Sequence, residues 1–300
     1  MLAWIMMGRL KPPPFEYDAP ETIEEALDLL AEHADDVKVL AGGQSLIPLM
    51  ALRLARPERL VDVGLIDALR RLTANGSLTV GAGVRQRVAE RSSDVASSCP
   101  LLTQALPLVA HVPIRARGTV GGSLAHADPA AELPAVALLA DATMVARRRG
   151  SERAIPASEF FQGFFETALE PDELLVEISL PRWPARTGSS FQEIARRHGD
   201  FALVGAGAVV GLDERGAIAD ARLAFTGVAS TPQRVTEAEA ALRGAEPSAE
   251  AFAAAAAIVR ATVDPGDDLH ATAAYRRHVA GVLTARVLAE AARRAAEGTS

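Results

Sequence analysis

The stretch VLAGGQSLIPLM, residues 39–50, ends an apolar run with two glycines and a polar pair before a second apolar run begins. Glycine adopts left-handed backbone angles without steric cost and lets a ligand approach the main chain closely. Ser45 is placed to cap a following helix, and Pro48 fits a first helical turn, whose amides have no intrahelical partner. The stretch therefore predicts a strand, a sharp turn and a helix start whose free amides bind an anion such as phosphate.

A second glycine-rich stretch, GTVGGS at residues 118–123, predicts another such turn, with Thr119 and Ser123 as hydroxyl donors. Neither stretch contains the GK[ST] of an ATPase loop, and neither matches GxGxxG after a strand. The GAGAVVG of residues 205–211 has the wrong spacing for that motif and is interpreted as small residues in a packed strand. Two neutral turns in one domain suit a pyrophosphate, with plain connecting loops as the alternative.

Composition limits the classes of function. A chain of 300 residues, 49% of them hydrophobic, is long enough for two domains, and a net charge of −7 argues against a nucleic-acid partner. The single cysteine, Cys99, excludes a disulfide within the chain and an iron–sulfur cluster held by this chain alone, and it is interpreted as a buried small residue. No apolar stretch is long enough to span a membrane, and the six histidines show no metal-ligand spacing. With a single cysteine, the chain is expected to be cytoplasmic.

Periodicity predicts alternating helices and strands in the first part of the chain. Thr22 and Glu25 fit a capping box that begins a helix, and Asp128 with Pro129 predicts the cap and first position of another. After residue 184 the pattern changes to two or three strands with a DERG turn, followed by alanine-rich helices over residues 236–297. We therefore place a domain boundary near residue 184, and residues 1–9 are expected to be an N-terminal extension of little structural weight.

The segments AGGQSLIPLM and GTVGGSLAHADPAAELP resemble the two FAD signatures of the flavoprotein subunits of molybdenum hydroxylases. This family includes the medium chain of aerobic CO dehydrogenase and the flavin subunit of xanthine dehydrogenase. The likeness continues through LEPDELLVEISLP and ARRHGDFALVGAGAVV to AYRRHVAGVL near the end of the chain.

The resemblance implies an α+β fold. A PCMH-type FAD-binding domain of two α/β subdomains (about 10–64 and 65–184) is expected first. A C-terminal CO dehydrogenase flavoprotein-like domain, with a small antiparallel sheet and a helical bundle, is then expected over residues 185–300.

The resemblance also implies the cofactor-binding residues. Those of the two motifs lie around the FAD pyrophosphate: Ala41, Gly42, Gly43, Gln44, Ser45 and Leu46 from the first, and Thr119, Gly121, Gly122 and Ser123 from the second. Those near the ribose or flavin ring are Glu132, Leu174 and Phe201, where Phe201 is alternatively a core residue at a strand start. Asp128 is either a ligand or a helix cap.

Three further side chains have two interpretations each. His126 either touches the cofactor or packs the loop, while Arg115 and Arg117 either offset pyrophosphate charge or are exposed residues flanking a loop. Some relatives carry a lysine at the flavin near Gln192 or Glu193, and this chain has none there. No catalytic residue and no metal ligand is assigned.

The implied function is an FAD-dependent electron-transfer subunit of an oxidoreductase. A small subunit with 2Fe–2S clusters delivers electrons, a large molybdopterin subunit oxidises the substrate, and quinone, oxygen, NAD or a carrier protein accepts them. The expected assembly is a dimer of heterotrimers, with peripheral association to a membrane electron acceptor as an option. A free-standing flavin oxidase and an assembly scaffold without flavin are the alternatives.

Overall fold

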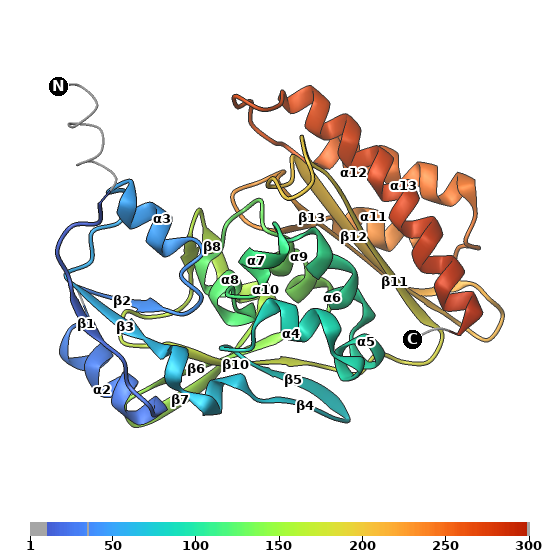
Figure 1. Ribbon diagram of the computed structural model, residues 1–300. Helices are drawn as coiled ribbons and strands as arrows, with labels where there is room; N and C mark the ends of the chain where they lie inside the picture. Colours follow the sequence, from blue (N-terminus) through green and yellow to red (C-terminus); the bar gives the residue numbers. More distant parts are fainter. Residues whose placement is uncertain (1–10, 35, 299–300) are drawn as a thin grey trace.

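The computed structural model describes residues 11–34 and 36–298. The N-terminal extension expected over residues 1–9 therefore lies outside the described residues. Figure 1 shows a small parallel sheet with α2 at one end, a larger sheet covered by short helices in the middle, and a second sheet backed by long helices at the other end. The predicted α+β class, including the antiparallel C-terminal sheet with its helices, is confirmed.

The first sheet is parallel, with strand order β1-β3-β2. The predicted capping box is present, because Thr22 accepts from the Glu25 amide at 3.2 Å and Glu25 accepts from the Thr22 amide at 3.3 Å. The elements here are β1 (Glu16–Asp18), α2 (Ile23–Glu32), β2 (Val37–Leu40), α3 (Leu46–Ala51) and β3 (Arg59–Asp62), followed by the 3-10 helices η1 (Val63–Leu65) and η2 (Asp67–Arg70).

A five-stranded antiparallel sheet, in the order β4-β5-β10-β6-β7, forms the centre of the molecule. Its strands are β4 (Leu72–Asn75), β5 (Ser77–Gly81), β6 (Thr143–Arg148), β7 (Ser151–Pro156) and β10 (Leu174–Leu180). Short helices lie above it in Figure 1: α4 (Gln86–Arg91), α5 (Ser93–Ser98), α6 (Pro100–Ala105), η3 (Leu106–Leu108), α7 (Val112–Arg115), α8 (Val120–His126), α9 (Glu132–Leu139) and α10 (Ala157–Phe160). A small hairpin, β8 (Phe161–Gly163) and β9 (Glu166–Thr167), follows α10. Cys99 belongs to this core and is 2% exposed, as predicted.

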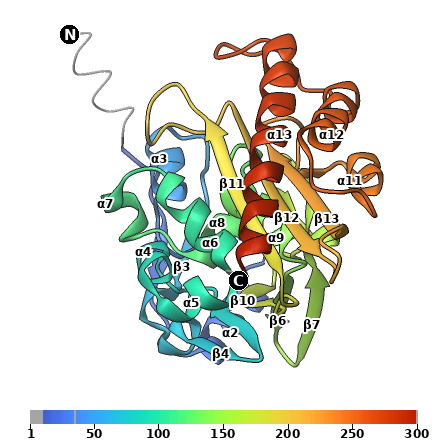
Figure 2. The ribbon, with the colours of Figure 1, turned by 90° about the vertical axis from the view of Figure 1, so that its right-hand side faces the viewer.

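The C-terminal sheet lies between two layers of helices (Figure 2). Its strands are β11 (Thr187–Ile194), β12 (Val204–Leu212), β13 (Ile218–Thr226) and β14 (Gln233–Arg234), and its own helices are α11 (Thr236–Leu242), α12 (Ala249–Thr262) and α13 (Ala273–Glu297). The opposite face packs on α6 and α9 of the preceding part. The GAGAVVG segment lies in β12, as predicted, and a Cβ on Gly207 would collide with Leu139 of α9. Its small residues therefore let the sheet approach α9 closely.

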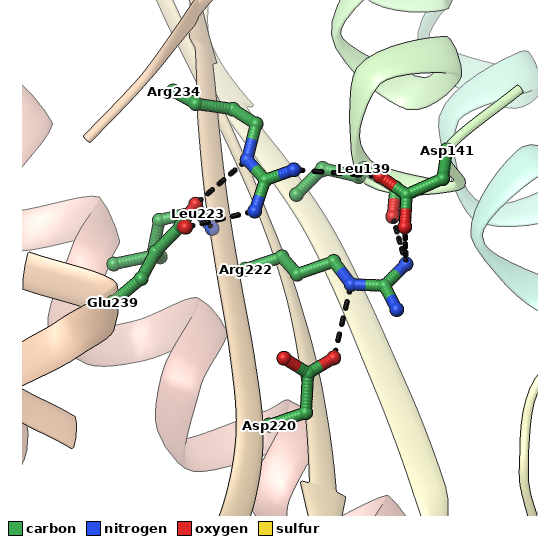
Figure 3. A network of polar contacts seen from close by, with 7 residues as sticks. All are labelled: Leu139, Asp141, Asp220, Arg222, Leu223, Arg234 and Glu239. Carbon is green, nitrogen blue, oxygen red and sulfur yellow. Dashed lines mark hydrogen bonds and ion pairs between the residues drawn. The ribbon is translucent and has the colours of Figure 1, made fainter. Parts of the chain in front are cut away.

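A polar network also ties this sheet to the end of α9 (Figure 3). Arg222 on β13 forms an ion pair with Asp141 at 2.7 Å and donates to the Leu139 carbonyl at 3.1 Å. Arg234 is held by Glu239 at 2.8 Å and reaches Asp141 at 3.4 Å. Arg222 also pairs with Asp220 on its own strand at 3.0 Å. Each arginine thus binds one acid of the C-terminal sheet or its helices and also Asp141, just after α9, which holds the end of α9 against the sheet.

The predicted helix start at Asp128 is wrong, because α9 begins at Glu132 with Ala131 as its N-cap residue. Asp128 instead closes a turn, accepting from the Ala130 amide at 2.8 Å. The C-terminal domain holds this turn: the Thr226 hydroxyl lies 2.6 Å from the Pro129 carbonyl and 2.8 Å from the Ala131 carbonyl, and the Gly227 amide donates to Pro129 at 2.8 Å. These contacts from the C-terminal domain hold residues 128–131 in the turn that precedes α9.

Candidate functional site

Two neighbouring clefts lie along the two glycine-rich segments. The first cleft, about 440 Å³, is bounded by the β2–α3 turn, the start of α8, the segment before α7 and the loop between β11 and β12. The second cleft, about 470 Å³, lies between β2, the start of β10 and the β8–β9 hairpin. Ala41 and Gly122 line both clefts, so the two spaces meet where the two glycine-rich segments meet.

Twelve of the fourteen predicted cofactor-binding residues line the first cleft: Ala41, Gly42, Gly43, Gln44, Ser45, Leu46, Thr119, Gly122, Ser123, Asp128, Glu132 and Phe201. The other two, Gly121 and Leu174, line the second cleft.

The β2–α3 turn has the predicted geometry. Gly43 has a φ of +71°, in the left-handed region that glycine favours. Within residues 11–34 and 36–298, the backbone amides of Gly43, Gln44 and Ser45 donate to no protein acceptor. Ser45 occupies the N-cap position of α3, but its side chain makes no capping bond, so the predicted hydroxyl cap is wrong. The turn thus offers three amides, and the Ser45 hydroxyl is not used by the helix.

The second glycine-rich segment differs from the prediction, because it is the first part of helix α8 rather than an open turn. Its amides are already used: Val120 donates to Val84, Gly121 to Ala82, Gly122 to the Thr119 hydroxyl, and Ser123 to the Thr119 carbonyl. A Cβ on Gly121 would collide with Ala82, so this glycine serves close helix–strand packing. The predicted free amides are absent from these four residues, and the segment offers the hydroxyls of Thr119 and Ser123 to the first cleft.

An aromatic pair marks the boundary between the clefts. His126 lines the first cleft, Phe165 lines the second, and their ring centroids are 4.9 Å apart. Phe165 has a φ of +56° and its amide donates to the Ala127 carbonyl at 3.3 Å. Both interpretations of His126 therefore stay open, since it packs against the hairpin and also faces a cleft.

Glu132 is a buried acid in the wall of the first cleft. It is 4% exposed, and burial raises the pKa of its carboxyl to about 7, with a smaller contribution from the charge of Asp128. Burial also raises the pKa of Glu193 on β11 to about 8, with the charge of Glu132 adding to the shift. The two carboxyl groups, one before and one after residue 184, therefore interact, and burial favours the protonated form of each.

Arg115 is not an exposed residue flanking a loop. It is 4% exposed, binds Glu90 at 2.9 Å, and donates to the carbonyls of Val109 and Ala110 at 2.8 and 2.9 Å. Arg115 lines neither cleft, and it braces the segment that forms one wall of the first. Arg117, in contrast, is exposed.

The residues of the first cleft that the sequence did not predict include Gln86, His111, Gly118 and Asp200. Gln86 begins α4, where only it and Ala89 are buried. A polar residue on the apolar side of a short helix was the available signal. His111 and Asp200 lie in connections whose course the sequence pattern does not define, and Gly118 is the first residue of the GTVGGS motif.

Other classes of site find no support in the described part of the chain. It contains no group of three or more His, Cys, Asp or Glu side chains that could hold a metal ion. No helix in that part is long and apolar enough to cross a membrane.

The clefts fit a long, narrow ligand with an anionic centre. Amide donors lie at their junction, the first cleft is lined by apolar and aromatic side chains such as Val109, Ile114 and Phe201, and the second by Val39 and Leu174. A dinucleotide has this form, with a diphosphate between two ring systems. FAD therefore fits the residues present.

Comparison with known proteins agrees with this reading. Residues 13–183 match the family model of the FAD binding domain in molybdopterin dehydrogenase, and residues 189–291 match that of the CO dehydrogenase flavoprotein C-terminal domain. The chain is 41% identical to 6-hydroxypseudooxynicotine dehydrogenase complex subunit alpha of Paenarthrobacter nicotinovorans, covering 95% of this chain and 97% of that one. It is 40% identical to caffeine dehydrogenase subunit beta of a Pseudomonas species, over 95% and 97% of the two chains.

The fold agrees with solved structures of the same type. A carbon monoxide dehydrogenase chain from Hydrogenophaga pseudoflava superposes with a TM-score of 0.92 at 38% identity, covering 95% of this chain and 99% of that one. The chain thus belongs to the CO dehydrogenase flavoprotein family, the FAD-binding subunits of molybdenum hydroxylase-type oxidoreductases.

Proposed function

We propose that one FAD lies across both clefts, with its diphosphate at their junction. The free amides of Gly43, Gln44 and Ser45 would hold the diphosphate from one side, and the hydroxyls of Thr119 and Ser123 from the other. The observation that carries this proposal is the set of three unpaired amides beside the point that Ala41 and Gly122 share between the clefts.

The resemblance implies contacts of the flavin ring or ribose with both Leu174 and Phe201. Leu174 and Phe201 line different clefts, so a single isoalloxazine ring contacts one of them. We assign the ring to the first cleft, because both domains form its wall and Phe201 at its edge is 63% exposed. The adenosine half would then occupy the second cleft beside Leu174, which lies inside the FAD-binding domain.

The bound flavin would supply transfer of electrons singly or in pairs, and the protein would bind it, orient it and shield it. As a subunit of this kind, the chain would receive electrons from a 2Fe–2S subunit and pass them to quinone, NAD, oxygen or a carrier protein. We place the complex, a dimer of heterotrimers with a large molybdopterin subunit, in the cytoplasm, with peripheral membrane association where a quinone is the acceptor. The relatives are named for dehydrogenation of 6-hydroxypseudooxynicotine, caffeine and carbon monoxide, and in this proposal the large subunit selects the substrate.

Purification from the native host tests this assignment. The proposal predicts a yellow protein that co-purifies with an iron–sulfur chain and a molybdopterin chain, and whose flavin is bleached by substrate only when both partners are present. A yellow protein that oxidises a substrate without iron or molybdenum would favour the free-standing oxidase. A colourless protein that never takes up FAD would favour the scaffold.

A further inference from the structure

Among the described residues that line the first cleft, Gln86 alone has a buried side-chain polar atom without a hydrogen-bond partner. It is 4% exposed, and its Oε1 atom is buried without a hydrogen-bond partner. No residue from 11–34 or 36–298 bonds its Nε2 either. A buried amide group that makes no hydrogen bond destabilises the folded state. Among the side chains with such an unsatisfied buried atom, Gln86 alone lines the cleft, which makes it the one that a bound ligand can reach.

The surroundings hold Gln86 in place at the floor of the cleft. Its backbone amide donates to the Gly118 carbonyl at 2.9 Å, which ties the start of α4 to the start of the second motif. A Cβ on Gly118 would stand 2.8 Å from Oε1 of Gln86, so glycine at position 118 leaves the space that the carboxamide occupies. The apolar residues Ile114, Val109 and Ala110 also line this cleft.

The orientation of the carboxamide makes it a donor toward the cleft. Oε1 is the buried atom and the residue lines the cleft, so Nε2 faces the open space. Gln86 lines the first cleft but not the second. A ligand ring with a carbonyl or ring nitrogen acceptor would satisfy the donor.

We propose that Gln86 is a direct ligand of the isoalloxazine ring, donating a hydrogen bond from Nε2 to a carbonyl or nitrogen acceptor on the ring edge. This inference rests on the proposed function, because it takes the first cleft to hold the ring. A reduced flavin carries more negative charge on these acceptors than an oxidised one, so a donor there binds the reduced form more tightly. Through this direct contact Gln86 orients the ring and raises the reduction potential of the cofactor.

Gln86→Leu tests the inference, with Gln104→Leu as a matched control. Gln104 also has a buried, unpartnered Oε1, but it lines neither cleft and its Nε2 bonds Ser189 at 3.2 Å. The measurements on the FAD-loaded full chain are the midpoint potential of the flavin, its visible spectrum and the dissociation constant of FAD, with the thermal stability of the apoprotein beside them.

Three results are expected together. Gln86→Leu binds reduced FAD about tenfold less well relative to oxidised FAD, a fall of about 30 mV for the two-electron couple, and its flavin spectrum shifts. The apoprotein of Gln86→Leu is as stable as wild type or more so, since an unsatisfied amide has been replaced by an apolar side chain of similar size. Gln104→Leu leaves the potential and the spectrum unchanged.

An unchanged potential in Gln86→Leu overturns the inference, and so does a loss of FAD affinity without a spectral or potential change, because that pattern describes contact with the diphosphate or ribityl chain. Should Gln86→Leu bind no FAD, Gln86→Glu is measured instead, and a potential equal to wild type there overturns the inference as well. Failure of the wild-type chain to bind FAD would contradict the proposed function itself.

Discussion

Gly42 lies so close to Gly118 that a Cβ built on Gly42 would stand 2.6 Å from the Gly118 Cα and 2.5 Å from the Arg117 carbonyl oxygen. The two glycine-rich segments, 76 positions apart in the chain, therefore meet backbone to backbone. This contact brings the free amides of the β2–α3 turn next to the hydroxyls of Thr119 and Ser123. The junction of the two clefts depends on it.

Gly42→Ala is expected to push the two segments apart, because the added methyl group meets backbone atoms that cannot rotate away. The free energy of unfolding of the apoprotein should fall by about 1–3 kcal/mol, as for other overpacked sites, and FAD binding should weaken by more than that loss alone explains. Chemical denaturation and FAD titration of the variant measure both effects. Unchanged FAD affinity would show that the contact does not shape the site.

Gly43→Ala separates backbone strain from cofactor binding. At a φ of +71° the alanine costs about 1–2 kcal/mol of stability. Gly76→Ala is the matched control: Gly76 has a φ of +81° and open space around its Cβ position, and it lies outside both clefts. Both variants should lose stability from backbone strain, and Gly43→Ala somewhat more, because its methyl group also meets the side chains of Ile47 at 3.2 Å and Leu40 at 3.3 Å. Only Gly43→Ala should lose FAD affinity. Equal FAD affinity in the two would mean that the β2–α3 turn does not bind the cofactor.

The buried carboxyl of Glu132 predicts a pH dependence of the apoprotein. Its pKa is 4.5 in an exposed carboxyl and about 7 here, so between these values the folded state binds more protons than the unfolded chain. This contribution is fully present below about pH 4.5 and is lost as the pH rises through 7, by up to about 3 kcal/mol.

Glu132→Gln should remove this dependence while keeping the shape of the side chain. Denaturation at pH 5, 6 and 7 should give a flatter stability profile for the variant than for wild type. Parallel profiles would show that Glu132 ionises in the folded protein as it does in water.

Thr226→Val tests how the C-terminal domain sets the cleft wall. The substitution keeps the volume of the side chain but removes the hydroxyl bonded to the carbonyls of Pro129 and Ala131, which leaves two buried acceptors with fewer partners. We expect a loss of about 1–3 kcal/mol in unfolding free energy and a weaker FAD complex, because Asp128 and Glu132 flank this turn. Thr226→Ser, which retains the hydroxyl, should restore most of the FAD affinity. A Ser variant as weak as the Val variant would assign the effect to packing.

The amino-acid pattern alone predicts a good part of this architecture. Elements that depend on local spacing of residues can be predicted from the sequence. These are the capping box of Thr22 and Glu25, the strand before Gly42, the packed strand of residues 204–212 and the broken helices at the end of the chain. The two motifs also point to residues that do line adjoining clefts.

What local patterns miss is decided by partners distant in the chain. Asp128 and Pro129 have the composition of a helix start, but Thr226 and Gly227 hold the turn in another form. The glycines of the second motif suggest free amides, yet Val84 and Ala82 on the neighbouring segment accept those of Val120 and Gly121. Arg115 and Gln86 are both buried for reasons that only the tertiary contacts reveal.

Calorimetric titration of the apoprotein with FAD, and separately with FMN and ADP, tests most directly whether one dinucleotide spans both clefts. The account predicts one FAD bound per chain, with FMN and ADP each binding far more weakly, because each fills one cleft and only FAD joins them through the diphosphate at Ala41 and Gly122. No uptake of FAD by well-folded protein, or FMN binding as tightly as FAD, would contradict it.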